Sequence, residues 1–264
     1  MARRIHIVGS SPRTGTTLLA ELLACCFELE GFCEHELSIF RKPKDEFETF
    51  LSKDPRDVLV AASLLEIDPA LWILHMVRDP RDVVVSRHGR DPEHYWTNLR
   101  IWKFNRRAAR RAEGHPRFLT LRYEDLVRQP DAVQDQIARF LPFLERRSAF
   151  SEFPRLARPS RDARDALGEL RPLSSDSIGT WRAHKPRLAA QLARHGPIDR
   201  DLVELGYEPD AGWQRALVGV EPDHEESHIP ERQPIRRRVR RALRRRRKVR
   251  AYRRAVRQRV RARS

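Results

Sequence analysis

Residues 9–17, GSSPRTGTT, form a loop of small, polar and basic residues between an apolar run and a helical pattern. The free N–H groups at the start of such a helix, together with the helix dipole, favour a bound anion. Gly15 lets the backbone approach a ligand closely, and the guanidinium of Arg13 can donate to two oxygens at once. We expect the residues of this loop to hold a phosphate-bearing ligand, namely Arg13, Thr14, Gly15, Thr16 and Thr17.

The loop differs from the ATP-binding loop of form G-x-x-x-x-G-K-[ST]. Gly9 precedes Gly15 by one residue too many, and Thr16 occupies the position of the lysine that would reach the β and γ phosphates. A P-loop kinase that uses ATP and Mg²⁺ is therefore an alternative, but a disfavoured one.

A second candidate phosphate site begins where the apolar run 71–77 ends. Its sequence, RDPRDVVVS, sets Arg78 at that end and Ser86 on the helix expected to follow. A guanidinium and a hydroxyl that converge from two elements suit a phosphate monoester. Taken alone, Arg78 would also fit a surface pair with Asp79 or Asp82, and Ser86 a solvated hydroxyl.

Three titratable side chains follow one another in CEHE, at the end of the expected strand 31–36. Alternation along a strand would place Glu34 and Glu36 on one face and His35 on the other. A general base within hydrogen-bond reach of a reacting group typically contributes about 10²–10⁴-fold in rate. Any of the three could serve as that base.

These residues need a scaffold in which several strands end at one edge. Apolar runs that alternate with helical patterns predict an α/β fold, with a parallel sheet covered by helices on both faces. Such sheets bind ligands at the carboxyl ends of their strands, where all three motifs are expected. The expected strands are 4–9, 31–36, 71–77 and 117–122, and the expected helices are 15–28, 44–51, 54–65, 92–112, 130–141, 187–195 and 198–205.

The segment SPRTGTTLL resembles the 5′-phosphosulfate loop of sulfotransferases that use 3′-phosphoadenosine 5′-phosphosulfate (PAPS), and VRDPRDVVVS resembles their second signature. The resemblance implies the P-loop-like sulfotransferase fold and PAPS as co-substrate, and we expect no metal. It implies that Arg13 contacts the bridging and transferred groups. It also implies that Arg78 and Ser86 bind the 3′-phosphate.

Other parts of the chain resemble this family less specifically. YEDL implies that Tyr123 contacts the adenine end of the nucleotide, and SIGTW at 177–181 is similar to a nucleotide-capping segment. Many bacterial and Golgi members place a catalytic glutamate soon after the second strand; Glu34 matches that position best, and Glu36 is close behind. The resemblance implies transfer of a sulfuryl group to a hydroxyl or amine of a carbohydrate, a lipid-linked glycan or a small molecule.

The net charge of +16 belongs to one end of the chain. Residues 233–264 contain 17 Arg or Lys and no Asp or Glu, whereas residues 1–232 carry 36 basic and 37 acidic side chains. We predict a sulfotransferase domain at 1–210, a linker at 211–234 and a tail at 235–264 that is helical or disordered. An anionic membrane surface or a polyanion would suit the tail, with nucleic acid disfavoured. A non-catalytic polyanion-binding protein that acts through this tail is a further alternative.

Three cysteines without disulfide or zinc spacing indicate a reducing compartment. Residues 1–4 lead straight into the first apolar run, so we expect no signal peptide. We therefore expect a cytoplasmic protein, with the inner membrane surface as the place where a basic tail would attach.

Overall fold

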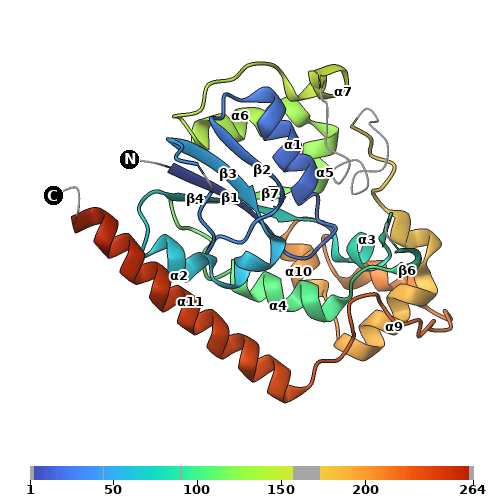
Figure 1. The fold of residues 1–264 in the computed structure, drawn as a ribbon. Coiled ribbons are helices and arrows are strands. Elements are labelled where there is room, and N and C mark those ends of the chain that lie inside the picture. The colour runs from blue at the N-terminus through green and yellow to red at the C-terminus, as the bar shows by residue number, and fades with distance from the viewer. Residues whose placement is uncertain (1–2, 44, 90, 157–172, 262–264) are drawn as a thin grey trace.

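The computed structural model describes residues 3–43, 45–89, 91–156 and 173–261. At its centre lies a five-stranded sheet in the order β2-β3-β1-β4-β7, in which every neighbouring pair is parallel (Figure 1). The strands are β1 Arg3–Gly9, β2 Gly31–Glu36, β3 Thr49–Lys53, β4 Leu71–Val77 and β7 Phe118–Arg122. The central strands β1 and β4 are nearly continuous apolar runs because helices cover both of their faces.

One face of the sheet packs against α1, α5 and α6, and the other against η1, α2 and α4. This arrangement confirms the predicted α/β class with helices on both faces. The helices of these two layers are α1 Thr16–Cys26, η1 Pro55–Leu59, α2 Ala61–Leu65, α4 Leu99–Ala109, α5 Tyr123–Arg128, α6 Pro130–Phe140, η2 Phe150–Glu152 and α7 Phe153–Leu156.

A third apolar cluster lies beyond the carboxyl ends of the strands. Trp181, Leu188, Leu202 and Trp213 are its buried centre. The elements around it are α3 Pro80–Val84, η3 Thr180–Ala183, α9 Lys185–His195, α10 Asp199–Glu204 and η4 Ala211–Leu217. A small antiparallel hairpin, β5 Arg87–His88 and β6 Asp91–Tyr95, precedes α4.

Three sequence expectations about local structure were wrong. The range 44–51 was expected to be helical, but residues 49–53 form strand β3, whose side chains are all buried between the two helical layers. The range 92–112 was expected to be one helix, but strand β6 ends at Tyr95 and α4 starts only at Leu99. Asn98 caps this helix, because its side chain accepts from Ile101 N at 3.2 Å. Ser86 does not lie on a helix, because α3 ends at Val84.

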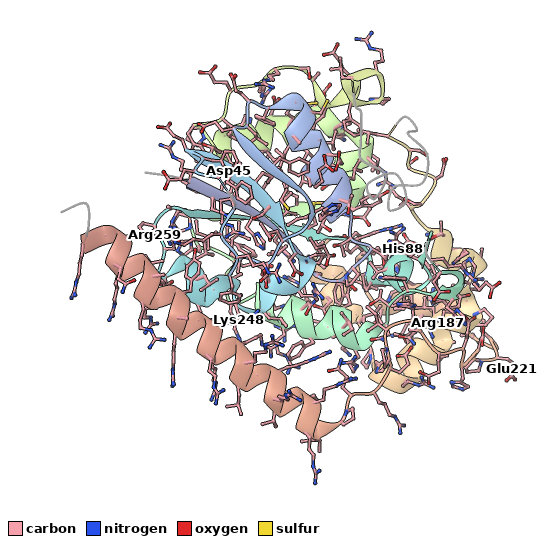
Figure 2. The ribbon with its side chains drawn as sticks, viewed as in Figure 1. Asp45, His88, Arg187, Glu221, Lys248 and Arg259 are labelled. Carbon is pink, nitrogen blue, oxygen red and sulfur yellow. The ribbon has the colours of Figure 1, made fainter. Side chains whose placement is uncertain are left out.

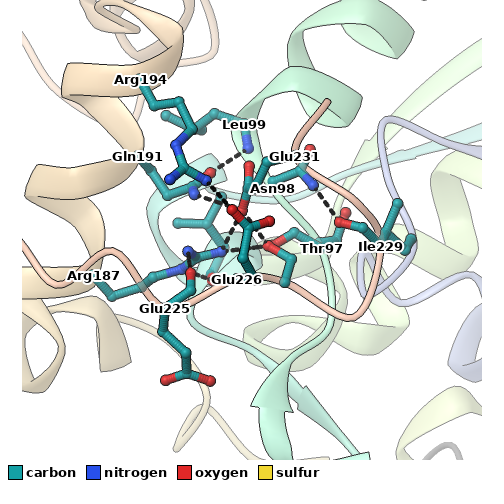
Figure 3. A network of polar contacts seen from close by, with 12 residues as sticks. Thr97, Asn98, Leu99, Arg187, Gln191, Arg194, Glu225, Glu226, Ile229 and Glu231 are labelled. Carbon is teal, nitrogen blue, oxygen red and sulfur yellow. Dashed lines mark hydrogen bonds and ion pairs between the residues drawn. The ribbon is translucent and has the colours of Figure 1, made fainter. Parts of the chain in front are cut away.

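Helix α11 Ile235–Arg261 runs along the outside of the body, beside α2 (Figure 1). The segment before it, expected to be a linker, contains η4 and contacts the body closely. Glu231 accepts hydrogen bonds from Arg187, Gln191 and Ser227, as Figure 3 shows for part of this network. The division of the chain into domains stays a prediction. In the parts of the chain described above, no helix is long and apolar enough to cross a membrane.

Candidate active site

The loop between β1 and α1 is tightly built. A Cβ atom on Gly9 would lie 2.5 Å from Thr14 Oγ1, and one on Gly15 would lie 2.6 Å from the ring of Tyr123. Gly15 has φ +88°, a left-handed conformation that only glycine adopts without strain. Arg13 has φ 71° and is the one non-glycine residue with positive φ in the described part of the chain. Such strain is typical of sites where the backbone is held for a ligand.

Hydrogen bonds among hydroxyl groups and a buried histidine hold this loop in place. Ser10 Oγ lies 2.9 Å from His75 Nε2, and His75 Nδ1 lies 3.2 Å from Thr120 Oγ1 on the adjacent strand. Complete burial lowers the pKa of His75 to about 3, so the ring is neutral and acts as a hydrogen-bonding spacer between the two hydroxyl groups. Thr14 Oγ1 donates to the carbonyl oxygen of Ser11 at 2.8 Å. The hydroxyl of Thr14 therefore shapes the loop.

Arg13 contacts both Arg78 and Ser86. Arg13 Nε donates to Ser86 Oγ at 3.0 Å, and Arg78 Nη1 donates to the carbonyl oxygen of Arg13 at 3.2 Å. Burial, and then the charge of Arg78, lower the pKa of Arg13 to about 10, so Arg13 remains charged at neutral pH. Two guanidinium groups held side by side repel each other, and an anion between them would relieve that repulsion.

The acidic neighbours of Arg78 are occupied elsewhere. Asp79 accepts from the side chain of Arg81 at 2.7 Å, which is itself buried. Asp82 accepts from the N–H groups of Gly179 and Trp181 at 2.7 and 3.0 Å. Arg78 donates to carbonyl oxygens, and its buried Nε has no hydrogen-bond partner in the described residues. The surface pair that Arg78 alone would have fitted is therefore not what the structure shows.

Tyr123 and the 177–181 segment complete this side of the site. The ring of Tyr123 packs on Gly15, and the guanidinium of Arg78 lies 4.5 Å from the ring centroid. The hydroxyl of Tyr123 lies 2.8 Å from Ser177 Oγ, and Arg78 Nη2 donates to the Ser177 carbonyl oxygen at 2.6 Å. Ser177 is thus a candidate site residue that the sequence analysis did not single out, although it is the first residue of the SIGTW motif.

On the other side of the loop, Lys53 enters the site from the end of β3. Its ammonium donates to Thr17 Oγ1 at 3.1 Å. Burial lowers the pKa of Lys53, and nearby Glu36 and Glu21 oppose that effect. The sequence analysis missed Lys53 because it expected helices at 44–51 and 54–65 and left Lys53 between them, not at the end of a strand. A strand ending in lysine beside a phosphate loop would have been the signal.

Glu21, on α1, is a buried carboxyl group at the same place. It lies four residues after Thr17, on the same face of the helix, and is 8% exposed. Its Oε1 atom has no hydrogen-bond partner in the described part of the chain. Burial raises the pKa of Glu21, while the charge of Lys53 opposes this.

The base candidates lie at the end of β2, at the rim of the site. Glu34, His35 and Glu36 are all exposed. The register between β2 and β3 shifts between Phe32 and Glu36, so the simple alternation expected along this strand does not hold there. Glu36 is the register partner of Lys53, and its side chain also pairs with Arg56 at 3.2 Å. The side chain of Glu36 is 48% exposed, and the partial loss of water around it, together with the negative charge of Asp54, raises its pKa.

The chemistry of these donors fits a nucleotide with phosphate groups at two positions. The loop, Arg13 and Lys53 offer donors for one position, and Arg78, Ser86 and Tyr123 offer groups for a second. No group of three or more His, Cys, Asp or Glu side chains that could hold a metal ion occurs among the residues described.

A family model described as the sulfotransferase family matches residues 30–143. This segment includes Arg78, Ser86 and Tyr123 but not the loop at 9–17. The match bears out the predicted resemblance to sulfotransferases over that segment. No curated protein matches the chain.

Solved structures of sulfotransferases show a weak likeness. The sulfotransferase domain of the Synechococcus PCC 7002 olefin synthase is 19% identical over 69% of this chain and 88% of its own, with a TM-score of 0.47. The sulfotransferase domain from the curacin biosynthetic pathway is 18% identical over 73% and 98%, with a TM-score of 0.41. Retinol dehydratase in complex with androsterone and the inactive cofactor PAP is 15% identical over 88% and 83%, with a TM-score of 0.39. At these scores the likeness says nothing about the site or the substrate of this chain.

Proposed function

We propose that this protein transfers the sulfuryl group of PAPS to a hydroxyl or amine acceptor. The observation that carries the proposal is the pair Arg13 and Arg78: the buried guanidinium of Arg78 donates to the backbone carbonyl oxygen of Arg13, and Asp79 and Asp82 pair with other groups instead of Arg78. Such a pair suits two separate phosphate groups of one nucleotide. ATP, with all its phosphates in one chain, would use only the loop.

Each residue then has a role that follows from its position. The loop amides, Arg13 and Lys53 would hold the 5′ groups and stabilise the charge that develops on the leaving phosphate. Arg78 and Ser86 would hold the 3′-phosphate, and Tyr123 the adenine end. PAPS itself supplies the activated sulfuryl group, and the protein contributes positioning and electrostatic stabilisation.

The acceptor needs a base for its proton. Glu36 is the better placed of the two candidate glutamates, because it stands beside Lys53, which contacts the loop. Its raised pKa makes it a stronger proton acceptor than an ordinary glutamate. Glu34 lies two residues earlier at the rim and is the alternative base. We place the protein in the cytoplasm and propose as acceptor a carbohydrate, a lipid-linked glycan or a small molecule.

Calorimetric titration with 3′,5′-adenosine bisphosphate, the product that PAPS leaves, tests the proposal. We expect tight binding that does not change when EDTA is added. ATP with Mg²⁺ is the comparison ligand and should bind much more weakly. Binding of ATP with Mg²⁺ but not of the bisphosphate would instead support a P-loop kinase. Binding of neither would leave the polyanion-binding alternative.

A further inference from the structure

Helix α11 is fixed on the body by its C-terminal half. Val256 is 3% exposed, and Val249 and Tyr252 pack against the apolar layer around α2. The hydroxyl of Tyr252 donates to Asp68 at 2.5 Å, and Arg259 pairs with the same carboxylate at 3.2 Å. These contacts set which face of the helix looks outward.

The outward face is basic along its whole length. The helix spans 27 residues, or roughly 40 Å at 1.5 Å per residue. Helical periodicity places Arg236, Arg240, Arg247 and Arg254 opposite the face that contacts the body, and all four are exposed. Figure 2 shows a row of nitrogen-tipped side chains that point away from the body along this helix. No acidic residue follows Glu231 in the chain, so the charge on this face is unopposed locally.

The N-terminal half of α11 also exposes apolar side chains. Ile235, Val239 and Leu243 are 75%, 52% and 50% exposed. They follow one another at a spacing of four residues and form one stripe beside the basic face. An uncovered apolar stripe next to a row of arginines is the pattern of helices that lie in the plane of a membrane surface.

A hollow of about 350 Å³ runs between this helix and the body. Arg245, Arg246, Arg250 and Arg253 line it from α11, and the body contributes Leu59, Val60 and Ser63. A phosphate head group that entered it would meet guanidinium groups with geometry suited to its oxygens.

We propose that α11 docks the protein on the surface of an anionic lipid bilayer. The outward arginines contact lipid phosphates, and the stripe of Ile235, Val239 and Leu243 enters the boundary between head groups and acyl chains. A nucleic acid or an acidic glycan would satisfy the arginines but offers nothing to the apolar stripe. A second copy of the chain would bring an equally basic helix and be repelled. This inference does not depend on the proposed transferase activity.

Sedimentation of the full chain with vesicles tests the docking. We expect binding to vesicles of phosphatidylcholine mixed with phosphatidylglycerol, weakened by added salt, and little binding to phosphatidylcholine alone. Changing Arg236, Arg240, Arg247 and Arg254 together to Gln should weaken the partition by about a hundredfold or more. The matched control makes the same change at four exposed arginines of the body, Arg107, Arg111, Arg128 and Arg139. It should alter the partition onto vesicles by only a few fold.

The apolar stripe separates a membrane from a soluble polyanion. The double change Val239→Ser and Leu243→Ser should weaken vesicle binding by roughly tenfold and leave binding to a heparin fragment unchanged. Unaltered vesicle binding in this variant, or no vesicle binding by the natural chain at low salt, would overturn the proposal. So would heparin binding as tight as vesicle binding. Unchanged thermal melting of each variant shows that the body is still folded.

Discussion

The arginines of the candidate site and those of α11 differ in their burial and in how specific their contacts are. Arg78 is 6% exposed, and each of its contacts has a defined partner: a loop carbonyl, a second carbonyl and the ring of Tyr123. The arginines of the outward helix face are exposed and replaceable by one another. Specificity therefore depends on single residues in the site and on the sum of charges along the helix. Changes of one residue should have large effects in the first region and small ones in the second.

The largest expected effect is that of the base. Glu36→Gln should lower kcat by about 10²–10⁴-fold, because Gln cannot accept the acceptor's proton. The loss of kcat can be measured without a known acceptor by following the hydrolysis of PAPS, in which water takes the place of the acceptor. Since the pKa of Glu36 is raised above the ordinary value, kcat/KM should fall with decreasing pH sooner than an ordinary glutamate would require.

Glu34→Gln is the matched control for the base, since it removes the same charge two residues away. Bisphosphate binding should survive in both variants. A large loss of kcat in Glu34→Gln with normal turnover in Glu36→Gln would move the base to Glu34. Normal turnover in both would exclude the two glutamates of β2 and leave His35 and the buried carboxyl group of Glu21 as candidates.

The next largest effect concerns Arg78. Arg78→Lys keeps the charge but loses the fork of donors, so binding of 3′,5′-adenosine bisphosphate should weaken by about a hundredfold. Binding of 5′-AMP, which lacks the 3′-phosphate, should hardly change, and calorimetry measures both ligands. Arg107→Lys, on the outside of α4, should affect neither. Equal losses for the two ligands would show that Arg78 only supports the loop.

The elements that were predicted correctly are those whose signal is local. Strands β2 and β4 have the predicted bounds. Strand β4 is an apolar run buried on both faces, which is readable without its neighbours. The candidate site residues of the loop at 9–17 and of the RDPRDVVVS stretch likewise lie within a few positions of one another, and their roles stay predictions. Thr49–Lys53 was misread because the charged residues before it resemble the start of a helix.

The missed site residues depend on distant partners. Lys53 meets Thr17 across 36 positions, and Arg78 meets Ser177 across 99. No local sequence pattern indicates a contact between residues so far apart. These pairs are brought together only by the way the whole chain folds. The same reason applies to Asp82. The sequence suggested that it pairs with Arg78, but in the structure it accepts hydrogen bonds from the backbone of residues 179–181.

A last test lies between the two regions, at Glu231, which ties the segment before α11 to α9. Burial alone would raise its pKa, but hydrogen bonds from His195 and Ser227 and the charge of Arg187 outweigh burial and lower the pKa to about 2. A folded-state pKa below the ordinary 4.5 means that ionised Glu231 stabilises the fold above that pH. The stabilisation is lost as the pH falls from about 4.5 towards 2.

Glu231→Gln should therefore lower the free energy of unfolding by about 3 kcal/mol at neutral pH, since it leaves Arg187 buried without its counter-charge. Urea unfolding at a series of pH values measures the difference, which should shrink as Glu231 becomes protonated. Glu226→Gln, at an exposed pair with Arg194, should cost less than about 1 kcal/mol and depend on salt. Glu231 touches neither the candidate site nor the outward face of α11. The variant Glu231→Gln should therefore still bind the bisphosphate under conditions in which it is folded. A loss of vesicle binding but not of bisphosphate binding would show that Glu231 orients α11 and that the two regions work independently.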